Sequence, residues 1–190
     1  MFHPSLKGKF LIATPELRDP NFSEGVVLIC EHNDKGAFGL IINRKSTIRA
    51  EAKFEGQSDH EWITQQEIYI GGPVHTNHVL ILYRAESGDL VSENRIVDDV
   101  ALASSLTDLS HLNLFEKGGE GLRMYLGCSG WSEKQLESEI ETGAWKVLSS
   151  KTDMIFATKP LRVWKENLAR LGGKYSILAQ MPDSEDVNRN

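Results

Sequence analysis

Two adjacent apolar runs of strand length constrain the fold of this chain more than any other feature. They cover residues 25–32 and 37–43, and Asn-Asp-Lys-Gly at positions 33–36 separates them. This turn composition between β-branched segments predicts a β-hairpin. Both runs are apolar at successive rather than alternate positions, so we expect both faces of the hairpin to be covered. The hairpin should therefore lie at the centre of the fold.

The remaining segments predict an α+β protein. Neighbouring strands are joined by connections too short for helical crossovers, so we expect a mainly antiparallel sheet with helices packed on it. The expected strands cover residues 9–13, 68–70, 78–84, 94–104, 122–126 and 144–148. The expected helices cover residues 48–53 after a Ser46-Thr47 cap, residues from Ser132 to Gly143, and residues from Thr158 or its successor to Gly172. Residues 127–131 are expected to form a tight turn, with Ser132 and Gln135 as a capping box.

Composition describes a globular chain that needs no covalent cross-link. A chain of 190 residues buries roughly 70% of its unfolded surface. No apolar run approaches the ~20 residues of a membrane span, and the N-terminus lacks the pattern of a signal peptide. We therefore expect a cytoplasmic protein without a membrane partner. Cys30 and Cys128 lie in or beside apolar runs and are expected to stay reduced.

The formal net charge of -6 argues against direct DNA binding. An acidic protein repels phosphate backbones unless a local basic patch overcomes its overall field. The chain has no long basic run and no helix-turn-helix with basic recognition positions. We therefore expect a small ligand or a protein as partner, and the oligomeric state is left open.

Several sequence blocks together resemble one protein family. The blocks are residues 19–22 (Asp-Pro-Asn-Phe), 36–44, 71–74 (Gly-Gly-Pro-Val), 127–131 and 135–140. In this order they resemble the AlgH/YqgE family over about residues 8–171. The resemblance implies one domain over residues 1–190, with a strongly bent or bifurcated β-sheet that forms a pseudo-barrel, and helices outside it. Residues 182–190 are polar and should form a flexible tail.

The resemblance also implies a label, transcriptional regulator of exopolysaccharide production, for which the family offers no established chemistry. It therefore implies a regulatory or binding module of unassigned molecular activity. One departure concerns Cys128, since the family usually has an aromatic residue at that position. No family role for a cysteine can be transferred to this chain.

Three groups of reactive side chains can be compared with a purely structural role. Cys30 and His32 are two apart on a strand and would share a face, as in an imidazole-activated thiol. However, cysteine is among the most buried residue types, and the sequence offers no group to orient His32. Cys128 precedes the predicted helix, but a structural role is favoured. His75 and His78 lack further metal ligands, so we expect no metal and no cofactor.

The candidate ligand-binding cleft combines polar side chains at strand ends, in turns and at a helix start. These are Asp19, Asn21, His32, Asn43, Arg44, Gln135 and Glu139. Such positions line clefts, although the same residues also cap turns. Gly71 and Gly72 could bring backbone N–H groups to an anion, or could mark a sharp bend of the sheet.

Antiparallel pairing of the hairpin predicts that Asp19 and Asn21 meet Asn43 and Arg44. The resemblance adds that residues 127–131 and the helix start at Ser132 approach the same edge. The alternative to a regulatory module is an unrecognised enzyme or a protein that binds a small anion or nucleotide in this cleft.

Overall fold

The computed structural model describes residues 4–50, 66–85, 94–105, 109, 121–156 and 159–181, apart from the side chain at position 161. Within these residues the strands are β1 (Lys9–Ala13), β2 (Val26–Asn33), β3 (Gly36–Ile41), β4 (Lys45–Arg49), β5 (Glu67–Ile70), β6 (Val74–Arg84), β7 (Arg95–Val97), β8 (Val100–Ala103), β9 (Leu122–Ser132) and β10 (Trp145–Ser149). The helices are α3 (Gln135–Glu141), α4 (Thr152–Ile155), α5 (Pro160–Leu171) and α6 (Gly173–Ala179). The class is α+β, as predicted.

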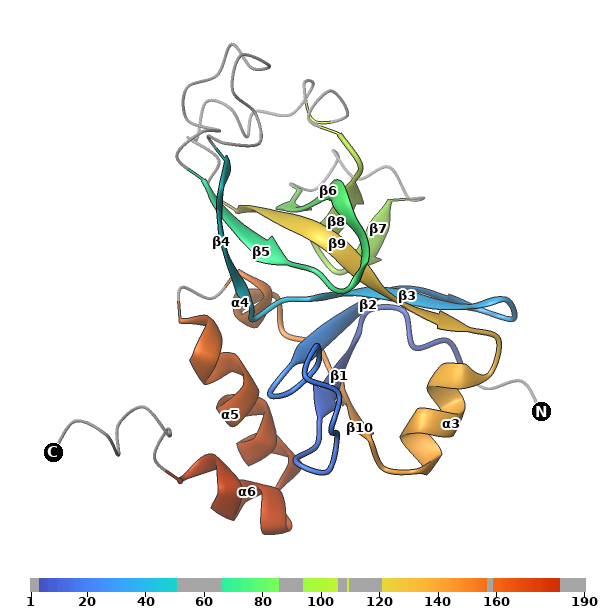
Figure 1. Cartoon of the computed structure of the whole chain (residues 1–190), viewed down its shortest axis with the longest axis vertical. Helices are drawn as coiled ribbons and strands as arrows, with labels where there is room; N and C mark the ends of the chain where they lie inside the picture. Colours follow the sequence, from blue (N-terminus) through green and yellow to red (C-terminus); the bar gives the residue numbers. More distant parts are fainter. Residues whose placement is uncertain are drawn as a thin grey trace, which may run out of the picture.

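One long strand, β9, joins the two halves of the sheet (Figure 1). The strand order is β10-β1-β2-β3-β9-β6-β8-β7, and β4 and β5 lie off this path. The C-terminal half of β9 pairs with β3, and its N-terminal half pairs with β6 and β5. All pairings are antiparallel except that of β5 with β9. This branching confirms the bent, bifurcated pseudo-barrel.

Glycines allow β9 to cross the chain between β5 and β6 at close range. Gly127 has φ 68, and a Cβ added there would lie 2.6 Å from the carbonyl oxygen of Gly72. A Cβ on Gly71 would lie 2.3 Å from the carbonyl oxygen of Gly127. The predicted tight turn at residues 127–131 is therefore wrong: the glycines bend a continuous strand that ends at Ser132.

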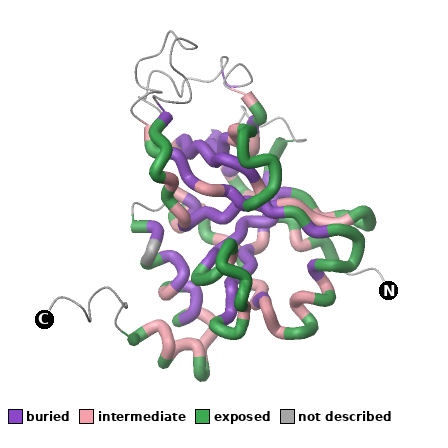
Figure 2. Tube along the Cα trace, viewed as in Figure 1, coloured by how far each residue is buried: buried purple, intermediate pink, exposed green. Residues whose placement is uncertain are grey.

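The central hairpin is confirmed, with both faces covered. Along β2, Leu28 packs in a core cluster with Trp164 and Leu168 of α5. The alternate residues Val27 and Ile29 pack in a second cluster, which includes Leu136 of α3. Figure 1 shows α5 and α3 on opposite sides of this part of the sheet, and Figure 2 shows the buried strands between them. Successive apolar residues are needed because each face has its own core.

The segment that follows the hairpin begins as a strand where a helix was predicted: residues 48 and 49 belong to the strand, and Ala50 is the first helical residue. Residues 45–49 form β4, which pairs with β5. The hydroxyl of Ser46 accepts a hydrogen bond from the Ile48 N–H at 2.9 Å. Serine often competes with helix formation in this way, by bonding to nearby backbone groups. The rest of the predicted helix, residues 51–53, lies outside the described residues.

The helix that was predicted to begin at Ser132 begins further along the chain. Its first residue is Gln135, and Lys134 precedes it with φ 59. The Gln135 Oε1 atom accepts hydrogen bonds from the Ser132 N–H at 3.0 Å and from its hydroxyl at 3.1 Å. Gln135 thus accepts the hydrogen bond that the capping box predicts for it. Ser132, however, is the last residue of β9 and does not cap the helix, whose N-cap is Lys134. Gly143 (φ 83) ends the helix as predicted, with its N–H bonded to the Ile140 carbonyl.

Helix α5 has Pro160 in its first turn and stops at Gly172, both as predicted. Helices α4 and α6 were not predicted. Among the described residues, no helix is both long and apolar enough to cross a membrane. The predicted flexible tail at residues 182–190 lies outside the described residues.

Candidate functional site

Asn43 fixes the outer end of the hairpin, where β2 begins and β3 ends. Its Oδ1 atom accepts a hydrogen bond from the Val26 N–H at 2.8 Å, and its Nδ2 donates to the Glu24 carbonyl at 2.8 Å. Glu24 has φ 54, a left-handed conformation that is uncommon for residues other than glycine. The side-chain amide of Asn43 therefore holds the chain in a sharp approach to β2.

Arg44, in the link between β3 and β4, holds the loop of residues 19–24. Its guanidinium donates to the carbonyl oxygens of Asn21 at 2.5 Å, Ser23 at 2.8 Å and Pro20 at 3.3 Å. Burial lowers the pKa of Arg44, and the nearby charges of Asp19 and Glu24 partly offset this effect. Arginine stays protonated because its ordinary pKa is far above neutral.

The predicted meeting of Asp19 and Asn21 with Asn43 and Arg44 is confirmed. Asp19 contributes by closing a local turn, since its Oδ1 accepts a hydrogen bond from the Asn21 N–H at 2.8 Å. The same residues therefore both close local turns and gather at the outer end of the hairpin. The hydrogen bonds of this cluster tie the loop of residues 19–24 to the outer end of the hairpin.

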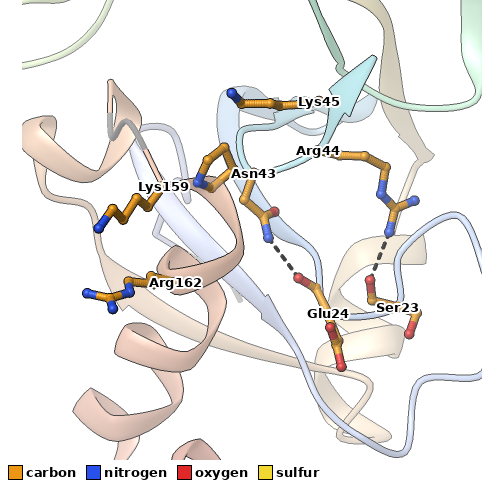
Figure 3. Close-up of a pocket in the computed structure, with 8 residues that line it drawn as sticks. Ser23, Glu24, Asn43, Arg44, Lys45, Lys159 and Arg162 are labelled. Carbon is orange, nitrogen blue, oxygen red and sulfur yellow. Dashed lines mark hydrogen bonds between the residues drawn. The ribbon is translucent and has the colours of Figure 1, made fainter. Parts of the chain in front are cut away.

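A cleft of about 690 Å³ lies between this end of the hairpin and the start of α5. It is lined by Ser23, Glu24, Asn43, Arg44, Lys45, Lys159, Pro160 and Arg162. Figure 3 shows Lys159 and Arg162 on the α5 side, Ser23 and Glu24 on the loop side, and Asn43 between them. Its volume is typical of small-molecule sites.

The lining of the cleft is strongly basic. Lys45 pairs with Glu67 at 2.7 Å, and this hydrogen bond raises the pKa of Lys45. In the part of the chain that the structure describes, the side chains of Lys159 and Arg162 make no hydrogen bond or ion pair. The first turn of α5 also has no side-chain cap. Both cations are exposed on the α5 side, and Figure 3 shows their side chains extending away from Asn43 and Glu24.

Sequence reasoning missed Lys159 and Arg162, because they are far from the hairpin in the chain. One local signal was present. Cations in the first turn of a helix oppose its dipole, which favours negative charge there. A helix predicted to begin near Pro160 with a basic residue on either side indicates a position where an anion would relieve that cost.

The other polar residues of the predicted cleft lie elsewhere. Ser132 pairs with Gly36, at the turn end of the hairpin, while Val27 pairs with Ile41 near the outer end. The prediction that the helix start joins the outer end is therefore wrong. Phe22, in the loop of residues 19–24, contacts the other region, since its ring stacks on Trp131 with centroids 6.2 Å apart.

His32 lies near the turn end and contacts α3. Its Nδ1 accepts a hydrogen bond from the Leu6 N–H at 3.0 Å, so its Nε2 carries the proton that faces Glu137 Oε1 at 2.9 Å. Glu137 is the orienting group that the sequence did not reveal. The backbone amide and the carboxylate together fix the ring.

Cys30 does not share a face with His32, contrary to prediction. A register shift between Ile29 and Glu31 changes the alternation of the strand. Cys30 therefore packs in the core cluster beside α5, while His32 contacts α3. Burial raises the pKa of the Cys30 thiol and of the Cys128 thiol. We expect that neither cysteine is required for activity, because a reactive cysteine needs an accessible thiolate.

Gln135 and Glu139 form an internal network on α3. Glu139 Oε2 accepts hydrogen bonds from the indole N–H groups of Trp131 at 2.9 Å and Trp145 at 2.8 Å. Its Oε1 accepts one from Gln135 Nε2 at 2.9 Å. This carboxylate joins α3 to two strands, which is a structural task.

Gly71 and Gly72 are buried where the strands cross, rather than beside the cleft. The Gly71 N–H donates to the Leu126 carbonyl at 2.8 Å, and its carbonyl accepts from the Ile41 N–H at 2.9 Å. The rings of His75 and His78 stack with centroids 5.6 Å apart. No group of three or more potential metal ligands occurs among the described residues.

The fold and cleft define a class of protein: an α+β pseudo-barrel with a basic cleft of small-molecule size beside its central hairpin. The chain belongs to the AlgH-like family, whose model matches residues 10–176. It is 34% identical over 186 residues to a UPF0301 protein of Cytophaga hutchinsonii, covering 96% of this chain and 98% of that protein. It is 37% identical over 166 residues to one of Marinomonas sp. (strain MWYL1), covering 83% and 84%.

Two solved structures share the fold. The solution structure of the AlgH protein from Pseudomonas aeruginosa has a TM-score of 0.72 and 30% identity, over 96% of this chain and 99% of that chain. A crystal structure of a Corynebacterium diphtheriae protein has a TM-score of 0.76 and 23% identity, over 95% and 94%. The similarity to the Corynebacterium diphtheriae protein shows a shared fold only.

Proposed function

We propose that this protein is a regulatory binding module whose ligand is a small anion held in the cleft beside α5. The proposal rests mainly on the composition of the cleft wall. Four of its eight described lining residues are cations, namely Arg44, Lys45, Lys159 and Arg162, and one is a carboxylate, Glu24. This excess occurs in a chain whose formal net charge is -6.

The state of these cations supports the proposal further. Arg44 and Lys45 are engaged with backbone carbonyls and with Glu67, so they shape the cleft and its field. Lys159 and Arg162 are exposed at its rim and have no counter-ion among the described residues. We do not propose catalysis by either cysteine, because burial disfavours both thiolates.

Thermal melts in inorganic phosphate test the proposal. A ligand at 100 times its Kd adds about 2.7 kcal/mol of stability, so the midpoint should rise with phosphate concentration. The rise should shrink in a Lys159→Ala/Arg162→Ala double variant. A Lys35→Ala/Lys151→Ala double variant removes the same charge from exposed positions outside the cleft and should respond like the unmodified protein. Equal responses of the two double variants would contradict an anion site in the cleft.

A further inference from the structure

We propose that His32 is a pH-sensitive switch, which holds the N-terminal segment of residues 4–8 against the central hairpin and releases it when the imidazole takes up a second proton. The segment, β2 and α3 meet at this ring. In Figure 1 the N-terminal end of the described chain lies beside α3 and the turn end of the hairpin. The switch therefore does not depend on the anion cleft, which lies at the outer end.

Three hydrogen bonds attach the segment to β2. The Leu6 N–H donates to Nδ1 of His32 at 3.0 Å, and the Ser5 hydroxyl donates to the His32 carbonyl at 3.1 Å. Further along, the Gly8 N–H donates to the Ile29 carbonyl at 2.8 Å. Of these three bonds, the one at Leu6 ends on a titratable group. The attachment at Leu6 is therefore the part that can respond to pH.

The neutral ring satisfies both of its neighbours, and the charged ring cannot. Because Nδ1 accepts from Leu6, Nε2 carries the proton and donates to Glu137 Oε1 at 2.9 Å. A second proton must go to Nδ1, and an imidazolium has two donors and no acceptor. Two N–H groups would then face each other, so the bond to Leu6 would be lost. A part-buried N–H group without a partner is destabilising, which favours movement of one side.

The charged groups around the ring hold it in place when it is protonated. The side chain of His32 is only 6% exposed, and Glu137 of α3 would form an ion pair with the imidazolium. On β2 the neighbouring charge is the carboxylate of Glu31, and the opposite residue of β3, Ala37, is uncharged. The segment itself contributes a cation, Lys7, which an imidazolium repels. The segment should therefore move while the ring stays with α3.

Release of the segment would uncover apolar surface between β2 and α3. Leu6 packs against the core cluster that contains Val27, Ile29 and Leu136. Moving Leu6 away exposes part of that cluster to solvent. An imidazole ordinarily changes its charge between about pH 5 and 8, so mild acidification is enough to operate such a switch.

Nuclear magnetic resonance of the full chain between about pH 8 and pH 5 tests the switch. Two-bond ¹H–¹⁵N spectra show which ring nitrogen of His32 is protonated, and we expect the Nε2–H tautomer at neutral pH. Hydrogen exchange of the Leu6 amide is compared with that of an unstructured chain at the same pH. Its protection should fall about tenfold or more as His32 takes up the second proton. The Ile42 N–H, bonded to the Val26 carbonyl at the outer end, should stay protected.

Variants connect the release to this one imidazole. His32→Asn keeps an acceptor oxygen at the position of Nδ1 but cannot titrate, so the protection of Leu6 should no longer change with pH. His78→Asn removes an exposed histidine of β6 and should leave the transition unchanged. Glu137→Gln removes the charge that favours the imidazolium, so the transition should move to lower pH. Glu141→Gln, at an exposed position of α3, should not move it.

Several outcomes would overturn the switch. They are a Leu6 protection that stays constant while His32 becomes protonated, a ring that stays neutral throughout, and an Nδ1–H tautomer at neutral pH. A parallel loss of protection at Ile42 would show general acid unfolding instead of local release. Persistence of the transition in His32→Asn would assign it to another group. Should that variant fail to fold, equal transitions in Glu137→Gln and Glu141→Gln would overturn the switch by themselves.

Discussion

At the scale of single residues, Arg44 shows how one side chain can organise a loop. A guanidinium has five N–H donors and no acceptor, so it suits a cluster of backbone carbonyls that the strands leave unpaired. Arg44 serves three such carbonyls between Pro20 and Ser23. Its first task is therefore to shape one wall of the cleft.

Replacing Arg44 with alanine should destabilise the protein by about 1–3 kcal/mol, because backbone carbonyls lose charged hydrogen bonds. Arg18→Ala removes an exposed arginine that has no side-chain partner among the described residues, and should cost much less. Denaturant unfolding monitored by tryptophan fluorescence measures both. Equal losses would mean that the contacts of Arg44 with the loop contribute nothing.

At the same scale, the carboxylate of Glu139 bridges Trp131 and Trp145. Glu139→Gln keeps the size of the side chain but removes its charge, and should lower the free energy of unfolding by about 1–3 kcal/mol. Near-ultraviolet circular dichroism should change with it, since the neutral amide has one acceptor oxygen where the carboxylate has two, and that oxygen accepts the indole hydrogen bonds more weakly. Glu141→Gln on the exposed face of α3 is the matched control, and a loss as large there would contradict the bridging role.

At the scale of elements, local chemistry explains which parts of the fold could be predicted. The hairpin was predictable because its turn residues and its successive apolar positions are encoded locally. The continuity of β9 could not be predicted, because in the sequence alone Gly127 indicates a turn. Only the structure shows that Gly71 and Gly72 pass close to this part of the strand. The same limit hid Lys159 and Arg162, which reach the cleft only through the packing of α5.

Another element, the β4–β5 pair, carries a pH-dependent contact between Lys45 and Glu67 at 2.7 Å. The hydrogen bond to Lys45 holds the pKa of Glu67 below its ordinary value. The stabilisation from this ion pair is therefore fully present above the pKa that Glu67 has in the unfolded chain. It is lost as the pH falls through the lower pKa that Glu67 has in the folded protein. Because both side chains are exposed, the contribution should be only about 0.2–1 kcal/mol.

Comparing the unfolding free energy of the unmodified protein with that of Glu67→Gln measures this contact. The difference should be present at neutral pH and vanish in acid, below the folded pKa of Glu67. A difference that persists at low pH would show that the substitution acts through something other than the charge.

At the scale of the whole molecule, the acidic net charge and the small basic cleft favour different partners. A surface with a formal charge of -6 repels extended polyanions, while a local group of cations still attracts a small one. Under the proposed function, the cleft attracts a small anionic ligand while the overall charge disfavours DNA.

We therefore expect no tight binding of duplex DNA by the protein alone at physiological salt. Specific DNA-binding proteins reach about 10⁻⁸–10⁻¹¹ M under such conditions. Fluorescence anisotropy with labelled duplexes checks this. Sequence-selective binding below micromolar concentration would contradict the expectation.

The most direct test of the anion site is a two-dimensional ¹H–¹⁵N nuclear magnetic resonance titration of the full chain with inorganic phosphate. The account predicts saturable shifts concentrated at the backbone amides of Glu24, Asn43, Arg44 and Arg162, which surround the cleft. The Lys159→Ala/Arg162→Ala variant should lose these shifts, whereas Lys35→Ala/Lys151→Ala should retain them. Saturable shifts that cluster elsewhere, or none at all, would contradict the central claim that this cleft binds an anion.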